Sequence, residues 1–133
     1  MSIELELLTL MGGTSGDQLD SLVRTGAPLE AVEHLARYGI SAVSAGIITT
    51  QRLRQRRAKG QRLSLNESDR LYRVFRLVLQ AEQVFADPTK AARWLSKRQS
   101  AFDDRTPLEA TATTPGFTAV QECLERLAHG YSA

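Results

Sequence analysis

Helix-capping signals recur along this sequence and divide it into short segments. In a capping box, a hydroxyl residue and an acid or amide three positions later each bond the other's backbone N–H at the start of a helix. Three pairs with this spacing stand at predicted helix starts: Ser15 and Gln18, Ser64 and Glu67, and Thr106 and Glu109. Glycines stand where helices usually end, at positions 26, 39, 60 and 130. The sequence therefore predicts an all-α fold built from short helices.

Apolar residues recur every three or four positions between these signals, which is typical of amphipathic helices. The widest apolar stripe falls within residues 64–86 and consists of Leu71, Val74, Phe75, Val78, Leu79 and Phe85. Trp94 lies in register with Ala91 and Leu95, and Cys123 lies on the apolar face of the last predicted helix. We expect the side chains of Trp94 and Cys123 to be buried.

The remaining segments have weaker or different signals. Within residues 1–11, apolar residues at positions 3, 5 and 7 alternate with Glu4 and Glu6, so the segment is predicted to form a strand or a loose arm. Residues 96–105 are polar and have no period, so they are predicted to form a loop. Asp87, which a proline follows, predicts the start of a short helix, and Thr114 with Pro115 predicts the start of the last one.

The composition argues against several classes of protein. No apolar run approaches the roughly 18 residues of a membrane span, and the acidic N-terminal segment is unlike a secretory signal. Cys123 is the single cysteine, which excludes an internal disulfide and a cysteine-rich zinc site. His34 and His129 lie in different predicted helices and in no metal-ligand spacing. We expect a cytoplasmic protein without enzyme activity, cofactor or metal.

Positive charge is concentrated in one part of the chain. Residues 1–47 hold two basic and six acidic residues, a net charge of −4. Residues 48–80 hold nine basic and two acidic residues, a net charge of +7. The stretch from Arg52 to Arg62 contains six basic residues and no acid. This clustering favours a local binding site for a polyanion.

The segments around this cluster have the order of a helix-turn-helix. Residues 41–47 form its short first half, which contains Gly46, and a second helix runs from near Thr49 to Gly60. Arginine and glutamine suit bidentate contacts to guanine and adenine, and the residues predicted to reach bases are Thr49, Thr50, Gln51, Arg54 and Gln55. The residues predicted to hold phosphates are Arg52, Arg56, Arg57 and Lys59. The alternative is a solvated, arginine-rich helix face.

The segment that follows the basic cluster resembles a known family. The run LSLNESDR, from Leu63 to Arg70, resembles the start of the C-terminal domain of the Xre/MbcA/ParS antitoxins. The resemblance continues at Ala81, Val84, Phe85, Asp87, Lys90, Ala91, Trp94 and Leu95, and then at Pro107, Leu108, Gly116, Val120, Leu124, Arg126 and Gly130. The sequence departs from the family where Phe102-Asp103-Asp104 replaces a frequent Leu-Gly-Gly, and where Thr111 replaces an apolar residue.

This resemblance implies a type II antitoxin with two functional parts. Residues 1–15 are expected to form an N-terminal arm, and residues 16–62 a Cro-like helix-turn-helix DNA-binding domain. Residues 63–133 are expected to form a small helical domain for toxin binding and dimerisation. The usual partner of such proteins is a RES-domain toxin that depletes NAD⁺. The complex binds operator DNA and represses its own operon, so we expect a homodimer within a larger toxin–antitoxin complex, and no membrane partner.

We predict that the last helix and the C-terminal tail block the entrance to the toxin's active site. The predicted contacts are Arg126, His129, Gly130, Tyr131, Ser132 and Ala133. Tyr131 is a rigid aromatic anchor, and the terminal carboxylate could engage basic groups that bind the NAD⁺ pyrophosphate. The alternatives are a frayed terminus and, for His129, stabilisation of the helix end. For the whole protein, the alternative is a helix-turn-helix transcriptional regulator without a toxin partner.

Overall fold

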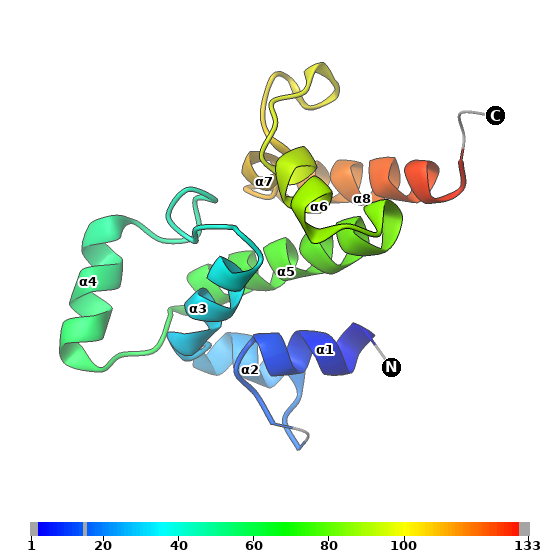
Figure 1. Ribbon diagram of the computed structural model, residues 1–133. Helices are drawn as coiled ribbons and strands as arrows, with labels where there is room; N and C mark the ends of the chain where they lie inside the picture. Colours follow the sequence, from blue (N-terminus) through cyan, green and yellow to red (C-terminus); the bar gives the residue numbers. More distant parts are fainter. Residues whose placement is uncertain (1–2, 15, 131–133) are drawn as a thin grey trace. The chain divides into compact units, whose positions relative to one another are not determined.

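The computed structural model describes residues 3–14 and 16–130 (Figure 1). The chain divides into two compact units. Unit 1, Met1–Phe75, contains α1 (Ile3–Leu10), α2 (Leu19–Thr25), α3 (Glu30–Arg37), α4 (Thr50–Lys59) and the first part of α5 (Leu65–Phe85). Unit 2, Arg76–Ala133, contains the rest of α5, α6 (Pro88–Leu95), the 3₁₀ helix η1 (Ser100–Phe102), α7 (Pro107–Ala110) and α8 (Thr114–Ala128). The described residues form no strand, which confirms the predicted all-α fold.

The N-terminal segment is a helix, so the prediction of a strand or loose arm for its first residues is wrong. α1 packs against α3, and Leu7 and Met11 are fully buried. The ring Nδ1 of His34 on α3 lies 2.9 Å from the backbone oxygen of Leu10, which ties the end of α1 to α3. Leu7, Leu8 and Met11 have the spacing of a helix face, and burial of that face outweighs the alternation before it.

Residues 41–47 form turns and not the helix expected for the first half of the DNA-binding motif. The backbone N–H of Ala45 donates to the oxygen of Ser41 over 2.9 Å, which closes one turn. Gly46 then adopts a φ of +78°, a left-handed conformation that prevents the turn from continuing as a helix. The segment is still packed into unit 1, since its apolar side chains are buried: Ala42, Ala45, Ile47 and the following Ile48.

Most predicted helix boundaries are confirmed. Ser64 and Glu67 make both bonds of a capping box at the start of α5, with N···O distances of 2.8 and 3.1 Å. Thr106 and Glu109 do the same at α7, and Asp87 caps α6. The glycines at positions 26, 39, 60 and 130 all have positive φ where helices end. These devices are predictable because they join residues only a few positions apart.

The starts of α8 and α2 do not agree with the predicted caps. The residue that caps α8 is Thr113, whose hydroxyl accepts the N–H of Gly116 over 3.1 Å. Thr114, the predicted cap, is instead the first residue of the helix. Of the capping box predicted at Ser15 and Gln18, Ser15 lies outside the described residues. Gln18 precedes α2 without a capping bond from its side chain.

Trp94 and Cys123 are only partly buried, so the prediction that both side chains are buried is wrong. The Trp94 ring lies 5.8 Å from that of Phe85 and 6.3 Å from that of Phe102, centroid to centroid. It therefore links α5, α6 and η1, while part of this large side chain reaches solvent. Cys123 falls at the margin of the α8 stripe, whose fully buried members are Val120 and Leu124.

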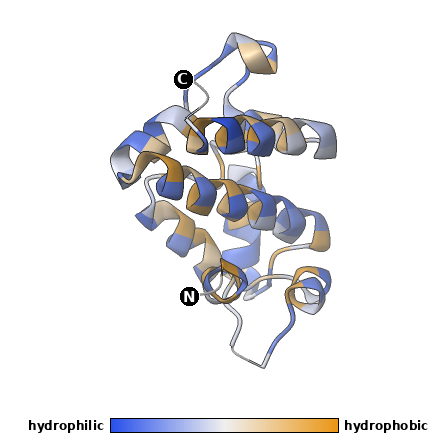
Figure 2. Ribbon diagram, turned by 90° about the vertical axis from the view of Figure 1, so that its right-hand side faces the viewer, coloured by the Kyte–Doolittle hydropathy of each residue, from blue (hydrophilic) through white to orange (hydrophobic). Residues whose placement is uncertain are grey.

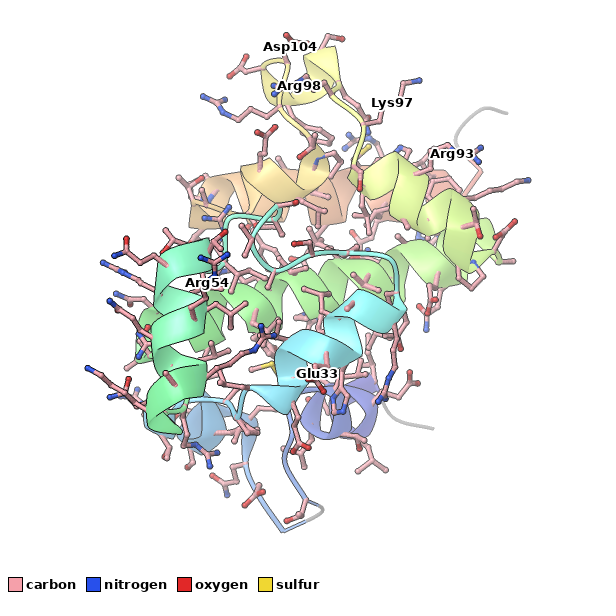
Figure 3. All side chains as sticks on the ribbon, turned by 60° about the vertical axis from the view of Figure 1, so that its left-hand side comes forward. Glu33, Arg54, Arg93, Lys97, Arg98 and Asp104 are labelled. Atoms are coloured by element: carbon pink, nitrogen blue, oxygen red, sulfur yellow. The ribbon has the colours of Figure 1, made fainter. Side chains whose placement is uncertain are left out.

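The segment 96–105 is a closed loop, as predicted. The N–H of Gln99 donates to the oxygen of Arg105 over 3.1 Å, and the two residues form an isolated antiparallel bridge. Asp103 and Asp104 have φ values of +54° and +63°, in the left-handed region that favours glycine. Asp104 lies at the tip of this loop (Figure 3). The loop is thus held by backbone bonds despite two unfavourable residues.

The division between the units falls inside α5, between Phe75 and Arg76. The predicted boundary between a DNA-binding domain (residues 16–62) and a toxin-binding domain (residues 63–133) divides the chain by binding partner, and it stays a prediction. Hydrophobic and hydrophilic residues lie on different sides of the same helices (Figure 2), in agreement with the expected amphipathic stripes. None of the helices in the described ranges is both long and apolar enough to cross a membrane.

Candidate nucleic-acid interface and partner-binding helix

α4 is attached to unit 1 through one narrow face. Leu53 is its buried apolar side chain, at 9% exposure. Arg56, nearly one turn later, is half-buried, and every other residue of α4 is exposed. The hydroxyl of Thr49 caps the helix by accepting the N–H of Arg52 over 3.2 Å. The sequence folds this way because one leucine in ten residues provides almost no apolar stripe.

Glutamines occupy the middle of the exposed face of α4. At roughly 100° per residue, Gln51 and Gln55 lie on the side opposite Leu53. Basic residues flank this face: Arg52, Arg54 (labelled in Figure 3) and Lys59. All the residues predicted to contact DNA, except Arg56, are exposed. The arrangement suits contact with base edges at the centre and with phosphates at the margins.

Arg56 is turned inward and pairs with Glu67 of α5. Its Nε lies 2.8 Å from Oε1 of Glu67, and its Nη2 lies 3.1 Å from Oε2. The two side chains are 21% and 6% exposed. The guanidinium therefore donates two parallel hydrogen bonds inside the protein. This geometry gives Arg56 a different partner from the phosphate that the sequence predicted.

Glu67 serves two helices at once. Besides Arg56 of α4, its Oε1 accepts the N–H of Ser64 over 2.8 Å, at the start of α5. Burial raises the pKa of Glu67, but the hydrogen bonds from Arg56 and Ser64 and the charge of Arg56 together hold that pKa below its usual value. The carboxyl is therefore ionised at neutral pH and joins α4 to the first turn of α5.

Two further arginines of the basic region also donate to backbone oxygens inside unit 1. Nε of Arg62 donates to the oxygen of Gly26 over 2.6 Å. Nη2 of Arg70 donates over 3.1 Å to the oxygen of Ala45, in the turns that precede α4. Burial, and then the nearby charge of Arg73, lower the pKa of Arg70. Not every charge in this basic region is therefore directed at an external polyanion.

The segment Leu63–Arg70 binds the linker between α2 and α3 as well. The N–H of Leu63 donates to the oxygen of Ala27 over 2.9 Å. The fully buried hydroxyl of Ser68 accepts the N–H of Ala27 over 2.8 Å. The sequence resemblance placed this segment at the start of the toxin-binding part. In the structure its contacts instead hold together the parts of the helix-turn-helix region.

The described part of the predicted toxin-binding site is the exposed end of α8. Arg126 and His129 are exposed, and Gly130 follows with a φ of +63°. Glu122 and Glu125 are exposed on the same helix, so this surface carries both signs of charge. The other predicted contacts lie outside the described residues: Tyr131, Ser132 and Ala133.

Sequence reasoning did not predict a hollow of about 510 Å³ in unit 2. It lies between the loop 96–105 and the first turn of α8, and its walls include small residues such as Ala110, Ala112 and Ala119. Asp103, Arg105 and Glu109 also line it, so charges of both signs face the hollow. Its signal in the sequence, a few scattered alanines, is too common to identify it.

The described residues include no group of three or more histidine, cysteine or carboxylate side chains that could hold a metal ion. The two histidines lie far apart in the sequence and in different surroundings. His34 faces the oxygen of Leu10, and the backbone N–H of His129 bonds the last turn of α8. The position of His129 agrees with its structural alternative as a residue that ends the helix.

Two models of known protein families match this chain, one in each half. A family model described as the antitoxin Xre-like helix-turn-helix domain matches residues 18–76. A second model, described as the antitoxin Xre/MbcA/ParS C-terminal toxin-binding domain, matches residues 80–130. The chain belongs to the Xre family of antitoxins. In this Xre-family chain the first match contains α2, α3 and α4, and the second contains α6, α7 and α8.

A curated relative supports the same family. Antitoxin Xre of Pseudomonas putida strain KT2440 is 41% identical to this chain over 85 residues. The matched region covers 64% of this Xre-family chain and 54% of the relative. The chain therefore spans about half the length of the curated relative that it matches.

Proposed function

We propose that this Xre-family protein is the antitoxin of a type II toxin–antitoxin system, and that it binds and neutralises a RES-domain toxin that degrades NAD⁺. The observation that carries the proposal is the match of residues 80–130 to a toxin-binding domain. The name of the similar Pseudomonas putida protein supports it. The RES class of the toxin follows from the resemblance to Xre/MbcA/ParS antitoxins. The protein acts in the cytoplasm, by contact and without catalysis of its own.

The end of α8 and the tail block the toxin's active-site entrance in this proposal. The exposed side chains of Arg126 and His129 meet the rim of the entrance, and Gly130, with a φ of +63°, follows the end of the helix. Tyr131, Ser132 and Ala133 then enter it. In this proposal Tyr131 is the aromatic anchor of the contact.

The first test is cellular NAD⁺ after induction of the protein encoded beside this gene, with and without this chain. We expect NAD⁺ to fall and this chain to restore it. A chain that lacks residues 130–133 should fail to restore it, and Arg126→Ala should restore it less well than the wild type. Arg93→Ala, an exposed arginine on α6, is the matched control and should have no effect.

NAD⁺ that stays constant, or that falls regardless of this chain, would overturn the toxin assignment. DNA binding by unit 1 would then carry the function, as in a transcriptional regulator without a toxin. Full neutralisation by the truncated chain would show that the tail has no part in the mechanism, and it would leave the toxin assignment in place.

We also propose that unit 1 represses the operon of its own gene by binding operator DNA as a homodimer. The exposed glutamines and arginines of α4 support this proposal, and two such helices related by a two-fold axis can bind a palindrome. Anisotropy titrations with the promoter region should give a dissociation constant that rises steeply with salt. Light scattering at micromolar concentrations should give the mass of a dimer, and a monomer would overturn that part.

A further inference from the structure

The pair of Arg56 and Glu67 lies behind the face of α4 that is proposed to contact DNA. Apart from this pair, Leu53 is the buried side chain of α4. A single apolar contact is non-directional, so it fixes the position of a helix better than its rotation about its own axis. A bidentate hydrogen-bonded pair restricts direction as well as distance. The rotation of α4 is therefore set mainly by Arg56 and Glu67.

We propose that Glu67 is a positioning residue that determines the base preference of this protein, and that Arg56 acts through Glu67 and not on DNA. This inference rests on the proposed DNA binding by unit 1. Glu67 never touches DNA in this scheme. It fixes which side chains of α4 face the groove.

The distribution of side chains around α4 explains why rotation matters. Gln51 and Gln55 lie opposite the attached face, and arginines lie on both flanks. A rotation by about one residue, roughly 100°, would replace the glutamines at the centre of the face by Arg52 or Arg54. The number of cations near the phosphates would hardly change, but the groups that meet base edges would change. Loss of the pair should therefore lower specificity more than it lowers non-specific affinity.

Glu67 is itself held in place, which a positioning residue requires. Its Oε1 accepts the N–H of Ser64 at 2.8 Å, so the carboxylate cannot follow Arg56 if α4 moves. Arg70, one turn further along α5, bonds the oxygen of Ala45 in the turns before α4. The first two turns of α5 thus hold both α4 and the segment that leads into it.

The decisive variant is Glu67→Gln, compared with Asp69→Asn in the full-length chain. Both remove one negative charge from the same end of α5. Asp69 pairs with Arg73 at 2.9 Å and has no contact with α4 among the hydrogen bonds of the described residues. Removal of an acid should tighten binding to any polyanion. A loss of operator affinity in Glu67→Gln alone would therefore have to come from the position of α4.

The measurement is the dissociation constant for a duplex from the promoter region of this gene and for a scrambled duplex of equal length and composition, at several salt concentrations. We expect Glu67→Gln to weaken promoter binding about tenfold. Its affinity for the scrambled duplex should be at least that of the wild type, and its salt slope should stay that of the wild type. Asp69→Asn should bind both duplexes at least as well as the wild type. Lys59→Ala should weaken both duplexes and reduce the salt slope by about 0.9.

The outcomes separate this inference from the function on which it rests. A wild type that binds the promoter no better than the scrambled duplex would overturn sequence-specific DNA binding, and the inference with it. A wild type with a preference that Glu67→Gln retains would overturn the inference alone. Arg56→Lys keeps both charges of the pair but cannot donate the two parallel hydrogen bonds of a guanidinium. It therefore provides a second variant if Glu67→Gln unfolds. It should lose the same preference.

Discussion

α4 and α8 are both exposed helices that we propose to meet a partner, but they are attached to the protein in different ways. α8 has two fully buried apolar residues, Val120 and Leu124, and packs against α7. α4 has one buried leucine and an ion pair, Arg56 with Glu67. Apolar burial is strong and non-directional, whereas the paired guanidinium is weaker but directional. The buried residues of α8 therefore contribute mainly to the stability of the fold, whereas the ion pair of α4 mainly fixes the orientation of that helix.

Leucine truncation should give the largest effect and the clearest contrast. Leu124→Ala leaves a cavity beside a fully buried position, and we expect the free energy of unfolding to fall by about 3–4 kcal/mol. Leu53→Ala, at the edge of its unit, should cost about 2 kcal/mol. Denaturant titrations measure both losses. Equal losses would show that α4 is packed as firmly as α8. Leu53→Ala should also abolish promoter preference without affecting toxin neutralisation.

Acid should weaken the attachment of α4 through Glu67. Because the folded-state pKa of Glu67 is lowered, its contribution to stability is present at neutral pH. That contribution is lost progressively as the pH falls below about 4.3 and through the folded-state pKa. Glu67→Gln mimics the protonated carboxyl, so its stability deficit relative to the wild type should shrink between pH 7 and pH 3. A constant deficit in denaturant titrations would contradict the pKa shift, and Asp69→Asn is the control.

Removal of the N-caps of α4 and α8 should have smaller effects on stability, of similar size in the two helices. Thr49 caps α4 and Thr113 caps α8, each by one hydroxyl that accepts a backbone N–H. We expect Thr49→Ala and Thr113→Ala to cost about 1 kcal/mol each. Thermal unfolding followed by circular dichroism measures both. Thr49→Ser, which retains the cap, should restore most of the loss at α4, and failure to do so would point to a lost methyl contact.

A glycine substitution in the loop 96–105, which precedes α7, should give the smallest effect. Asp104 has a φ of +63°, which glycine adopts more easily than any other residue. Asp104→Gly should therefore raise the free energy of unfolding by a few tenths of a kcal/mol. Asp104→Ala should lower it by about 1 kcal/mol, because alanine has no side-chain oxygen to bond the local backbone. Changes in the same direction for both variants would show that the carboxylate, and not the backbone, matters here.

The sequence predicts well those features that depend on neighbouring residues. The capping boxes at Ser64 and at Thr106 and the glycine stops join residues within one turn. The fold class and the exposed basic helix follow from the same local signals and from the charge pattern. The resemblance implies two glycines at the positions of Asp103 and Asp104, and both residues have the left-handed backbone that glycine favours.

The features that the sequence did not predict depend on distant partners. Arg56 and Glu67 are 11 positions apart and belong to different helices. Arg70 and Ala45 are 25 positions apart. In the charge pattern, each of these arginines looks the same as its exposed neighbours, and only the tertiary fold separates those that bind the protein from those that face solvent. The helical state of residues 3–10 is also decided by packing, here against α3.

The inward pairing of Arg56 also bears on how this protein can change through evolution. Exposed arginines of α4 can be exchanged one at a time, so the protein can adapt to a new operator by single substitutions. Positions 56 and 67 are not independent in this way, because a change at either one leaves the other half-buried or buried charge without its partner. Related sequences should therefore vary at these two positions together, while the positions around them drift separately.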